Sequence, residues 1–365
     1  MIETRIATPT IETVRAIHAA LDAERPLALL HPSDDARQRE LVEQADVPGD
    51  TAFVLFTSGS TAAPRGVVLS RSAIFAAAHA SAAHLGWRDD DRWLACLPLA
   101  HAGGLSIIVR CYASGKPIVL GTPTAISDVT LASLVPTQLD ALLADTSWRP
   151  PPQLRAVLVG GASASRALVD RALARGVPVL PTYGLTETFG QVATARSRGG
   201  PLVPLPGIEV VAGTPDEPTP IRIRGPMLAT RYLDGEPIAP ELVTSDLGYR
   251  EGETLVVVGR RDDVIITGGE NVHPAQVEAV LATTPGVIAA AAFGVLDERW
   301  GQIVAAALAV DARFDRSHAF AYWHSALPAH ARPRLIATVA ALPQLASGKI
   351  DRKRLLALPT EPVVY

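Results

Sequence analysis

Short apolar runs that alternate with alanine-rich helical patterns restrict the fold of this chain more than any other feature. The runs predict strands at residues 52–56, 93–97, 117–120, 156–159 and 177–180. Residues 72–85 and 165–174 have the composition of helices, and each begins with a serine, a common N-terminal cap. Such alternation is typical of an α/β domain in which helices cover layered sheets.

The pattern changes after about residue 200. Short strands at residues 208–212, 221–224 and 255–258, separated by Pro and Gly turns, predict a small β subdomain. Beyond the polar cluster at 260–263, helices near 274–282 and 317–326 flank strands near 287–293 and 303–310. A chain of 365 residues is long enough for two domains. We therefore expect a large N-terminal α/β domain with a small β subdomain, and a small α+β domain at the C-terminus.

Charge, cysteine content and hydropathy limit which partners and which cellular setting the chain can have. The formal net charge of −4 argues against a nucleic-acid surface, which needs a basic stripe. Cys96 and Cys111 lie in apolar segments and suit a reduced, cytoplasmic setting rather than a disulfide framework or a metal cluster. The first residues lack a basic leader, and no apolar run reaches the roughly 18–20 residues of a transmembrane helix. We expect no insertion into a membrane.

Residues 57–66 (TSGSTAAPRG) follow directly on the first of these predicted strands. In such a loop, backbone N–H groups and hydroxyls can turn toward phosphate oxygens while a cation neutralises their charge. The Walker pattern is absent, and a loop of this composition is also common without any ligand. Arg65 supplies the cation in a chain that has only three lysines, Lys116, Lys349 and Lys353.

Three further polar segments could contribute to a nucleotide site. In residues 183–188 (YGLTET), Tyr183 could stack on a base and Glu187 could hold Mg²⁺, although a capped strand-to-helix turn is an equal alternative. Asp246 lies in a predicted turn, where it could accept hydrogen bonds from ribose hydroxyls or simply stabilise the turn. Lys349 lies on a flexible turn near the C-terminus, where an isolated lysine is normally solvated.

In their order along the chain, these segments resemble the adenylate-forming superfamily of acyl-CoA synthetases, luciferases and peptide-synthetase adenylation domains. The resemblance runs from about residue 51 to residue 354 and rests on residues 57–66, 183–188, 244–248, 259–272 and 347–352. It implies two half-reactions at one site. A carboxylate attacks ATP in the presence of Mg²⁺ to form an acyl-adenylate and pyrophosphate, and the acyl group then passes to the thiol of coenzyme A.

The resemblance assigns most of these residues to the nucleotide. Its phosphate loop corresponds to Ser58, Gly59, Ser60, Thr61 and Arg65, with Ala62 and Arg65 standing where the family usually has Gly and Lys. Its other nucleotide-binding positions correspond to Gly161, Ala162, Tyr183, Gly184, Thr186, Asp246 and Arg260, with Thr186 at the α-phosphate, Glu187 at Mg²⁺, and Asp246 and Arg260 at the ribose. An arginine keeps the charge of a lysine but prefers bidentate geometry.

The resemblance also implies a division into residues 1–261, which bind AMP and the acyl group, and a mobile domain at 262–365, with Asp262 as the hinge. Lys349 matches the lysine that bridges the substrate carboxylate and the α-phosphate during adenylation, where added positive charge offsets the repulsion between two anions. For thiol attack the family rotates its C-terminal domain and presents the loop that contains Gly268 and Gly269. Members often form homodimers, and no feature of this sequence decides the oligomeric state.

Within the superfamily, this compact chain is most similar to the o-succinylbenzoate–CoA ligases of menaquinone biosynthesis, on the evidence of residues 97–105 and 133–139 and of Arg110. The similarity places the acyl substrate against His101, Gly103, Arg110 and Gly160, and it implies Lys349, Thr186, Glu187 and His101 as catalytic residues. Arg110 ends an apolar segment, where a charge is costly without a partner. In these ligases an arginine at this position faces the aromatic carboxylate that is not activated. The alternative is that Arg110 simply reaches the surface.

Other functions stay open at this point. A ligase for another fatty or aryl acid would share every nucleotide motif, and the surroundings of Arg110 would distinguish it. A peptide-synthetase adenylation domain is disfavoured because no carrier-protein segment follows Lys349. A catalytically inactive nucleotide-binding protein would fit Ala62 and Arg65, although the other motif residues argue against it.

Overall fold

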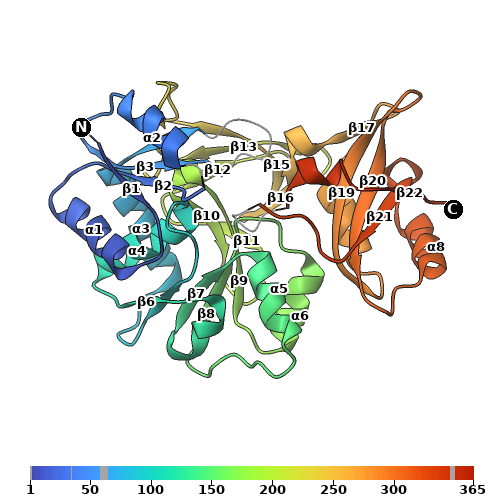
Figure 1. The fold of residues 1–365 in the computed structure, drawn as a ribbon, viewed down its shortest axis with the longest axis horizontal. Helices are drawn as coiled ribbons and strands as arrows, with labels where there is room; N and C mark the ends of the chain where they lie inside the picture. The colour runs from blue at the N-terminus through green and yellow to red at the C-terminus, as the bar shows by residue number, and fades with distance from the viewer. Residues whose placement is uncertain (1, 34, 58–64, 346–349) are drawn as a thin grey trace.

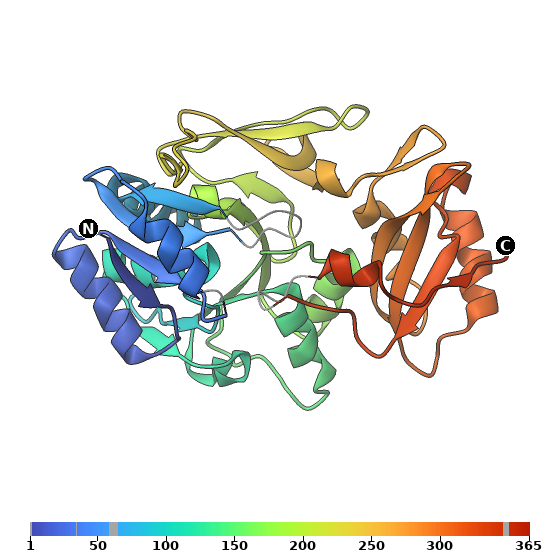
Figure 2. The ribbon, with the colours of Figure 1, turned by 45° about the horizontal axis from the view of Figure 1, so that its top comes forward.

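The structure is a computed structural model that describes residues 2–33, 35–57, 65–345 and 350–365. In this part of the chain, two sheets with helices between and beside them come from residues 3–260, and a third sheet comes from residues 265–362. The third sheet lies at the opposite end of the molecule from the N-terminus in both views (Figure 1, Figure 2).

The first sheet carries the predicted phosphate loop. Its strands are, in spatial order, β1 (Glu3–Ile6), β2 (Leu27–Leu30), β3 (Thr51–Phe56), β4 (Gly66–Ser70) and β14 (Arg231–Tyr232). Strands β1 to β3 run parallel, whereas β4 is antiparallel to both β3 and β14. Every residue of β2, β3 and β4 is buried, which explains their nearly continuous apolar sequences. Helices α1 (Ile11–Asp22) and α2 (Asp35–Glu43) connect the first three strands.

The second sheet has a parallel part and an antiparallel part. The parallel part comprises β5 (Trp93–Ala95), β6 (Ile118–Leu120), β7 (Leu131–Leu134), β8 (Ala156–Val159) and β9 (Val179–Leu185). The antiparallel part comprises β10 (Gly190–Ala195), β11 (Leu202–Pro204), β12 (Glu209–Val211), β13 (Thr219–Arg224), β15 (Leu242–Glu251) and β16 (Thr254–Arg260). The β9–β10 hairpin joins the two parts, so the predicted β subdomain continues the same sheet.

Helices cover both faces of the parallel part. Helices α3 (Arg71–Leu85) and α4 (Ala102–Ser114) pack on each other between the first sheet and strands β5 and β10. Helices α5 (Pro136–Ala144) and α6 (Arg166–Ala174) cover the other face (Figure 1). Alternate strand residues divide between the two cores, with Trp93 on the α4 side and Leu94 on the α5 side. Short helical turns lie at η1 (Pro123–Asp128) and η2 (Thr186–Thr188).

The C-terminal region has its own sheet and its own core. Its strands are β17 (Ile265–Thr267), β18 (Glu270–Val272), β19 (Val287–Asp297), β20 (Gly301–Val310), β21 (Leu335–Val339) and β22 (Glu361–Pro362). Its helices are α7 (Pro274–Leu281), α8 (Arg316–Ala326) and α9 (Arg352–Leu355), with the turns η3 (Arg261–Asp263) and η4 (Ala329–Ala331). The buried members of its two apolar clusters all come from residues 265–355.

The structure confirms most predicted elements and corrects three details. The predicted strand at 177–180 begins instead at Val179 and continues through Tyr183 to Leu185, because it pairs with β10 in a hairpin. Asp246 lies inside β15 rather than in a turn. The helix predicted at 72–85 begins at Arg71, and its N-terminal cap is Ser70 rather than Ser72. Within the described residues, no helix is both long and apolar enough to span a membrane.

Candidate active site

Predicted site residues gather where β5, β8 and β9 end, at one edge of the second sheet. Parallel strands place their carboxyl ends at the same edge, where ligands of α/β proteins commonly bind. Gly160 follows β8 and touches Thr182, since a Cβ at Gly160 would lie only 2.6 Å from Thr182 Cγ2. Gly161 has a φ of 77°, which favours glycine, and the exposed Ala162 follows it. The paired glycines therefore bring the backbone close to β9.

The β9–β10 hairpin positions the segment that contains Thr186 and Glu187. A Cβ at Gly184 would lie 1.7 Å from the carbonyl oxygen of Gly190 on the facing strand, so only glycine fits this close approach. The strand then ends in the η2 turn, where the Thr188 hydroxyl accepts the N–H of Leu185 at 3.1 Å. The capping role that the sequence left open thus belongs to Thr188, and the half-buried side chain of Glu187 takes no part in it.

Tyr183, Asp246 and Arg260 form one contact group. Tyr183 Oη donates a hydrogen bond of 2.7 Å to Asp246 Oδ2. Asp246 lies opposite Arg260 in the β15–β16 pair, with Arg260 Nη1 at 3.8 Å from Asp246 Oδ1. Burial and the Asp246 carboxylate raise the pKa of Tyr183, so the phenol remains a donor at neutral pH.

Glu187 and Arg65 belong to a second contact group, which Tyr232 joins. Tyr232 Oη donates 2.9 Å to Glu187 Oε1, and the Arg65 guanidinium lies 3.6 Å from the centre of the Tyr232 ring. Arg65 Nη2 also donates to Asp234 Oδ2 at 2.8 Å and to Glu236 Oε2 at 2.6 Å. Sequence reasoning missed Tyr232 because nothing in the sequence brings residue 232 beside residues 65 and 187.

Arg110 is buried, with only 4% of its surface exposed, so the alternative that it reaches the surface is wrong. Its guanidinium carbon lies 5.3 Å from the Trp93 ring centre, and a Cβ at Gly190 would lie 3.3 Å from its Nη2. No acidic side chain of the described residues forms an ion pair with it, and its Nε has no hydrogen-bond partner there. Burial lowers the pKa of Arg110 to about 10, which leaves it charged at neutral pH.

The other acyl-side residues lie around the start of helix α4. His101 is the residue before the helix, and its ring centre is 5.5 Å from that of His31. Gly103 is exposed in the first turn. The stricter demand for glycine falls on Gly104, where a Cβ would lie 2.3 Å from the carbonyl oxygen of Pro98. A second glycine beside Gly103 was the only sequence signal of that contact.

The remaining predicted residues lie either outside the described residues or after β16. Ser58, Gly59, Ser60, Thr61 and Lys349 lie outside the described residues. Asp262 is exposed in η3 and accepts a hydrogen bond of 3.3 Å from Arg260 Nη2. Gly268 and Gly269 form the β17–β18 turn with positive φ, and Gly268 faces Trp300.

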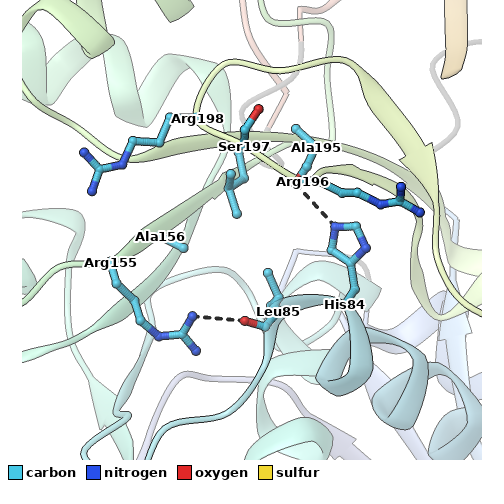
Figure 3. A pocket seen from close by; sticks show the side chains of 9 residues that line it. His84, Leu85, Arg155, Ala156, Ala195, Arg196, Ser197 and Arg198 are labelled. Atoms are coloured by element: carbon cyan, nitrogen blue, oxygen red, sulfur yellow. Dashed lines mark hydrogen bonds between the residues drawn. The ribbon is translucent and has the colours of Figure 1, made fainter.

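A separate hollow of about 190 Å³ contains none of the predicted site residues. It is lined by His84, Leu85, Arg155, Ala156, Leu180, Ala195, Arg196, Ser197 and Arg198. Its polar groups serve the fold, since Arg155 donates to the Leu85 carbonyl and His84 bonds the Ala195 carbonyl (Figure 3). Ala156 and Leu180 lie at the amino-terminal ends of β8 and β9, so the hollow is at the opposite edge of the sheet.

The arrangement provides three chemical functions. Asp246 beside Arg260 can bond vicinal hydroxyls, Arg110 can pair with a buried anion, and Glu187 offers carboxylate oxygen to a hard cation such as Mg²⁺. No group of three acidic, His or Cys residues in the described regions could hold a metal. A single carboxylate such as Glu187 suits Mg²⁺ whose other ligands are phosphate and water oxygens.

Known proteins share this fold and sequence. The 2-succinylbenzoate–CoA ligase of Bacillus cereus (strain Q1) is 35% identical over 344 residues, covering 84% of this chain and 70% of the relative. The o-succinylbenzoate CoA synthetase of Bacillus subtilis, solved with the acyl-adenylate intermediate OSB-AMP, has a TM-score of 0.81 at 28% identity and covers 97% of this chain and 87% of its own. The same enzyme with ATP and magnesium ion has a TM-score of 0.76 at 29% identity, over 96% and 83% of the two chains.

Two family profiles match consecutive parts of the sequence. The profile described as AMP-binding enzyme matches residues 3–233, which contain the β9–β10 hairpin, Arg65, Arg110 and Tyr232. The profile described as AMP-binding enzyme C-terminal domain matches residues 276–349. The first match alone spans more than half of the chain, so this protein belongs to the AMP-binding enzyme family.

Proposed function

We propose that the chain is an ATP-dependent 2-succinylbenzoate–CoA ligase of menaquinone biosynthesis. In the first step the succinyl carboxylate attacks the α-phosphorus of ATP, which forms the acyl-adenylate and releases pyrophosphate. In the second step the thiol of coenzyme A attacks the acyl carbon, releasing AMP and a proton. The proposal is supported by relatives that carry this name and by bound OSB-AMP in a structure of the same fold.

The buried cation of Arg110, which has no acidic partner among the described residues, is the single observation that carries the choice of acid. Burying an isolated charge costs several kcal/mol, so a protein retains one where a ligand supplies the opposite charge. A dicarboxylate such as 2-succinylbenzoate has a second carboxylate, on the ring, that stays unreacted and can take this position. A fatty acid has only the carboxylate that reacts. The place of Arg110, against Gly190 behind the β9–β10 hairpin, suits the acyl end of the site.

The remaining residues have roles that follow from their contacts. Asp246 and Arg260 are proposed to bond the ribose, with the Tyr183 ring against adenine and its hydroxyl fixing Asp246. Thr186 is proposed at the α-phosphate and Glu187 at the Mg²⁺ that accompanies ATP, where the metal neutralises phosphate charge. Lys349 is proposed to offset the charge between carboxylate and α-phosphate, and His101 to gate the acyl channel.

We also propose that residues 262–365 move as a unit about Asp262 between the two steps. The separate core of that region and its link through the short η3 turn support this division. Gly268 and Gly269 then belong to the face that meets coenzyme A. A cytoplasmic setting is proposed because both cysteines are free thiols, which suits a reducing compartment.

The test compares two acids that differ only in the ring carboxylate. Pyrophosphate release is measured with ATP, Mg²⁺ and either 2-succinylbenzoate or 4-oxo-4-phenylbutanoate, for the parent chain and for Arg110→Met. Removing one partner of a buried charge pair costs about 2–5 kcal/mol, so kcat/KM for 2-succinylbenzoate should fall by about 30-fold or more. The value for 4-oxo-4-phenylbutanoate should change little, because that acid has no carboxylate for Arg110.

Arg175→Met is the matched control. Arg175 directly follows α6 and donates to the Leu143 and Asp145 carbonyls at the end of α5, away from the acyl side. It should affect both acids equally. An equal loss with both acids in Arg110→Met would contradict the assignment of the ring carboxylate. Preferred turnover of benzoate or of a fatty acid by the parent chain would keep the ligase chemistry and discard the pathway.

A further inference from the structure

Tyr232 occupies a position between the two halves of the proposed phosphate site. One half is Arg65, the last residue of the loop between β3 and β4, whose N–H donates 3.1 Å to the Thr57 hydroxyl. The other half is Glu187, in the η2 turn that follows β9. These segments come from different sheets, and their side chains meet on Tyr232.

The ring and the hydroxyl of Tyr232 each make a specific contact. The ring supports the guanidinium of Arg65 at 3.6 Å, a distance that favours cation–π attraction. The hydroxyl donates 2.9 Å to Glu187 Oε1 and so leaves the second carboxylate oxygen available. Burial and the Glu187 carboxylate raise the pKa of Tyr232, which keeps the hydroxyl protonated.

The backbone holds Tyr232 in this place independently of both partners. Strand β14 pairs with β4, and the Leu233 N–H donates 2.8 Å to the carbonyl of Gly66, the residue after Arg65. The turn closes on itself, since the Tyr232 N–H donates 2.8 Å to the Glu236 carbonyl. On the other side, the Ala229 N–H donates 2.8 Å to the backbone carbonyl of Glu187. The segment from Ala229 to Glu236 thus bonds the backbone of both halves.

We infer that Tyr232 is a positioning residue that sets the separation and orientation of Arg65 and Glu187 for the triphosphate and its Mg²⁺. This inference rests on the proposed function. The ring holds the cation and the hydroxyl holds the metal carboxylate, so the two contributions are separable. Tyr232→Phe removes only the hydroxyl contact to Glu187, whereas Tyr232→Leu also removes the surface beneath Arg65.

The test measures ATP binding by calorimetry with no acid present, in Mg²⁺ and again in EDTA. Tyr232→Phe should raise the Kd for ATP about tenfold or more in Mg²⁺, the effect of one hydrogen bond to a charged group, and leave the Kd in EDTA unchanged. Tyr232→Leu should raise both values, because Arg65 binds phosphate with or without the metal. Pyrophosphate release at saturating ATP should require more Mg²⁺ in Tyr232→Phe.

Tyr112→Phe is the matched control, because the Tyr112 hydroxyl donates to Asp22 on the α1–α4 face. It should leave both Kd values unchanged. Equal Kd values for Tyr232→Phe and the parent chain in Mg²⁺ would overturn the inference, and so would equal weakening in Mg²⁺ and EDTA. If no acid released pyrophosphate but the ATP-binding differences were still observed, the proposed ligase activity would be discarded and the role of Tyr232 would stand.

Discussion

Arg155 is partly buried and Arg110 is buried, and the two arginines differ in what surrounds them. Arg155 donates to both oxygens of Asp91, at 2.8 and 2.6 Å, and to the carbonyls of Leu85 and Gly86. Arg110 is more deeply buried but has no such acid among the residues that the structure describes. A charge that serves the fold is paired within the fold, as Arg155 is. The contrast supports a ligand as the missing partner of Arg110.

Tyr183 permits a second test at the level of a single hydroxyl. Tyr183→Phe keeps the ring and removes the 2.7 Å hydrogen bond to Asp246 Oδ2. Asp246 then loses orientation toward the ribose, and we expect KM for ATP to rise about fivefold, the value of about 1 kcal/mol. KM for the acid should stay within twofold of the parent value in the same pyrophosphate assay. An increase confined to the acid would place Tyr183 at the acyl substrate instead.

Elements predicted from the apolar pattern agree with the structure, whereas the cap of α3 and details set by strand pairing do not. Strand β8 matches its predicted bounds, and Ser165 caps α6 by accepting the Leu168 N–H. The extension of β9 into the YGL segment depends on pairing with β10, a segment for which no strand is predicted. The position of Tyr232 beside Arg65 depends on pairing between segments that lie even farther apart along the chain. Motif order could locate the site, but not the side chains that reach it from distant segments.

Asp91 makes hydrogen bonds that join the residues just before β5, β7 and β8, and these bonds make the stability of the fold depend on pH. Its buried carboxylate accepts from Arg155, from the Thr130 hydroxyl at 2.7 Å and from the Arg88 N–H at 2.7 Å. Burial raises the pKa of Asp91, but these hydrogen bonds outweigh burial and leave the pKa below its usual 3.8. A group with a depressed folded pKa stabilises the fold above its unfolded pKa, and that stabilisation is lost as pH falls.

We therefore expect Asp91→Asn to cost about 3–5 kcal/mol at pH 7, since it leaves Arg155 without its charge partner. Chemical denaturation of the parent chain and the variant should give free energies of unfolding that converge as pH falls below about 4. Asp89→Asn is the control, because that exposed carboxylate is 4.0 Å from Lys116 and should matter little. If the difference in free energy of unfolding between the parent chain and Asp91→Asn did not change with pH, the loss would come from altered packing and not from the lost charge.

At the scale of the whole molecule, the C-terminal region combines an independent core with a polar tie near the proposed hinge. Arg352 Nε lies 3.1 Å from Asp263 Oδ2 in η3, and Nη2 lies 3.3 Å from Glu278 Oε1 on α7. Its Nη1 donates 2.7 Å to the Ala292 carbonyl of β19. Arg352, which is three residues beyond Lys349 in the sequence, thus joins the start of the region to its last helix. The tie lets residues 262–365 move together if they rotate about Asp262.

Arg352→Met should loosen this region selectively. The change leaves two largely buried carboxylates without their cation, at a cost of about 3–5 kcal/mol. Burial raises the pKa of Glu278, and Arg352 only partly opposes this. An acid with a raised folded pKa loses stabilisation as pH rises through that value, so the deficit should be larger at pH 8 than at pH 5. Amide hydrogen exchange should accelerate in peptides from 265–362 and stay unchanged in β3 and β8.

Arg313→Met removes a solvent-exposed pair with Asp311 in the same region and should leave exchange unaltered. Faster exchange throughout the chain in Arg352→Met would mean that the two regions unfold as one unit, and the proposed boundary at 261 and 262 would fall. Selective loosening has a functional consequence as well. In the proposed mechanism adenylation needs Lys349 from the C-terminal region, so pyrophosphate release should slow in Arg352→Met while ATP binding to the N-terminal residues keeps its Kd.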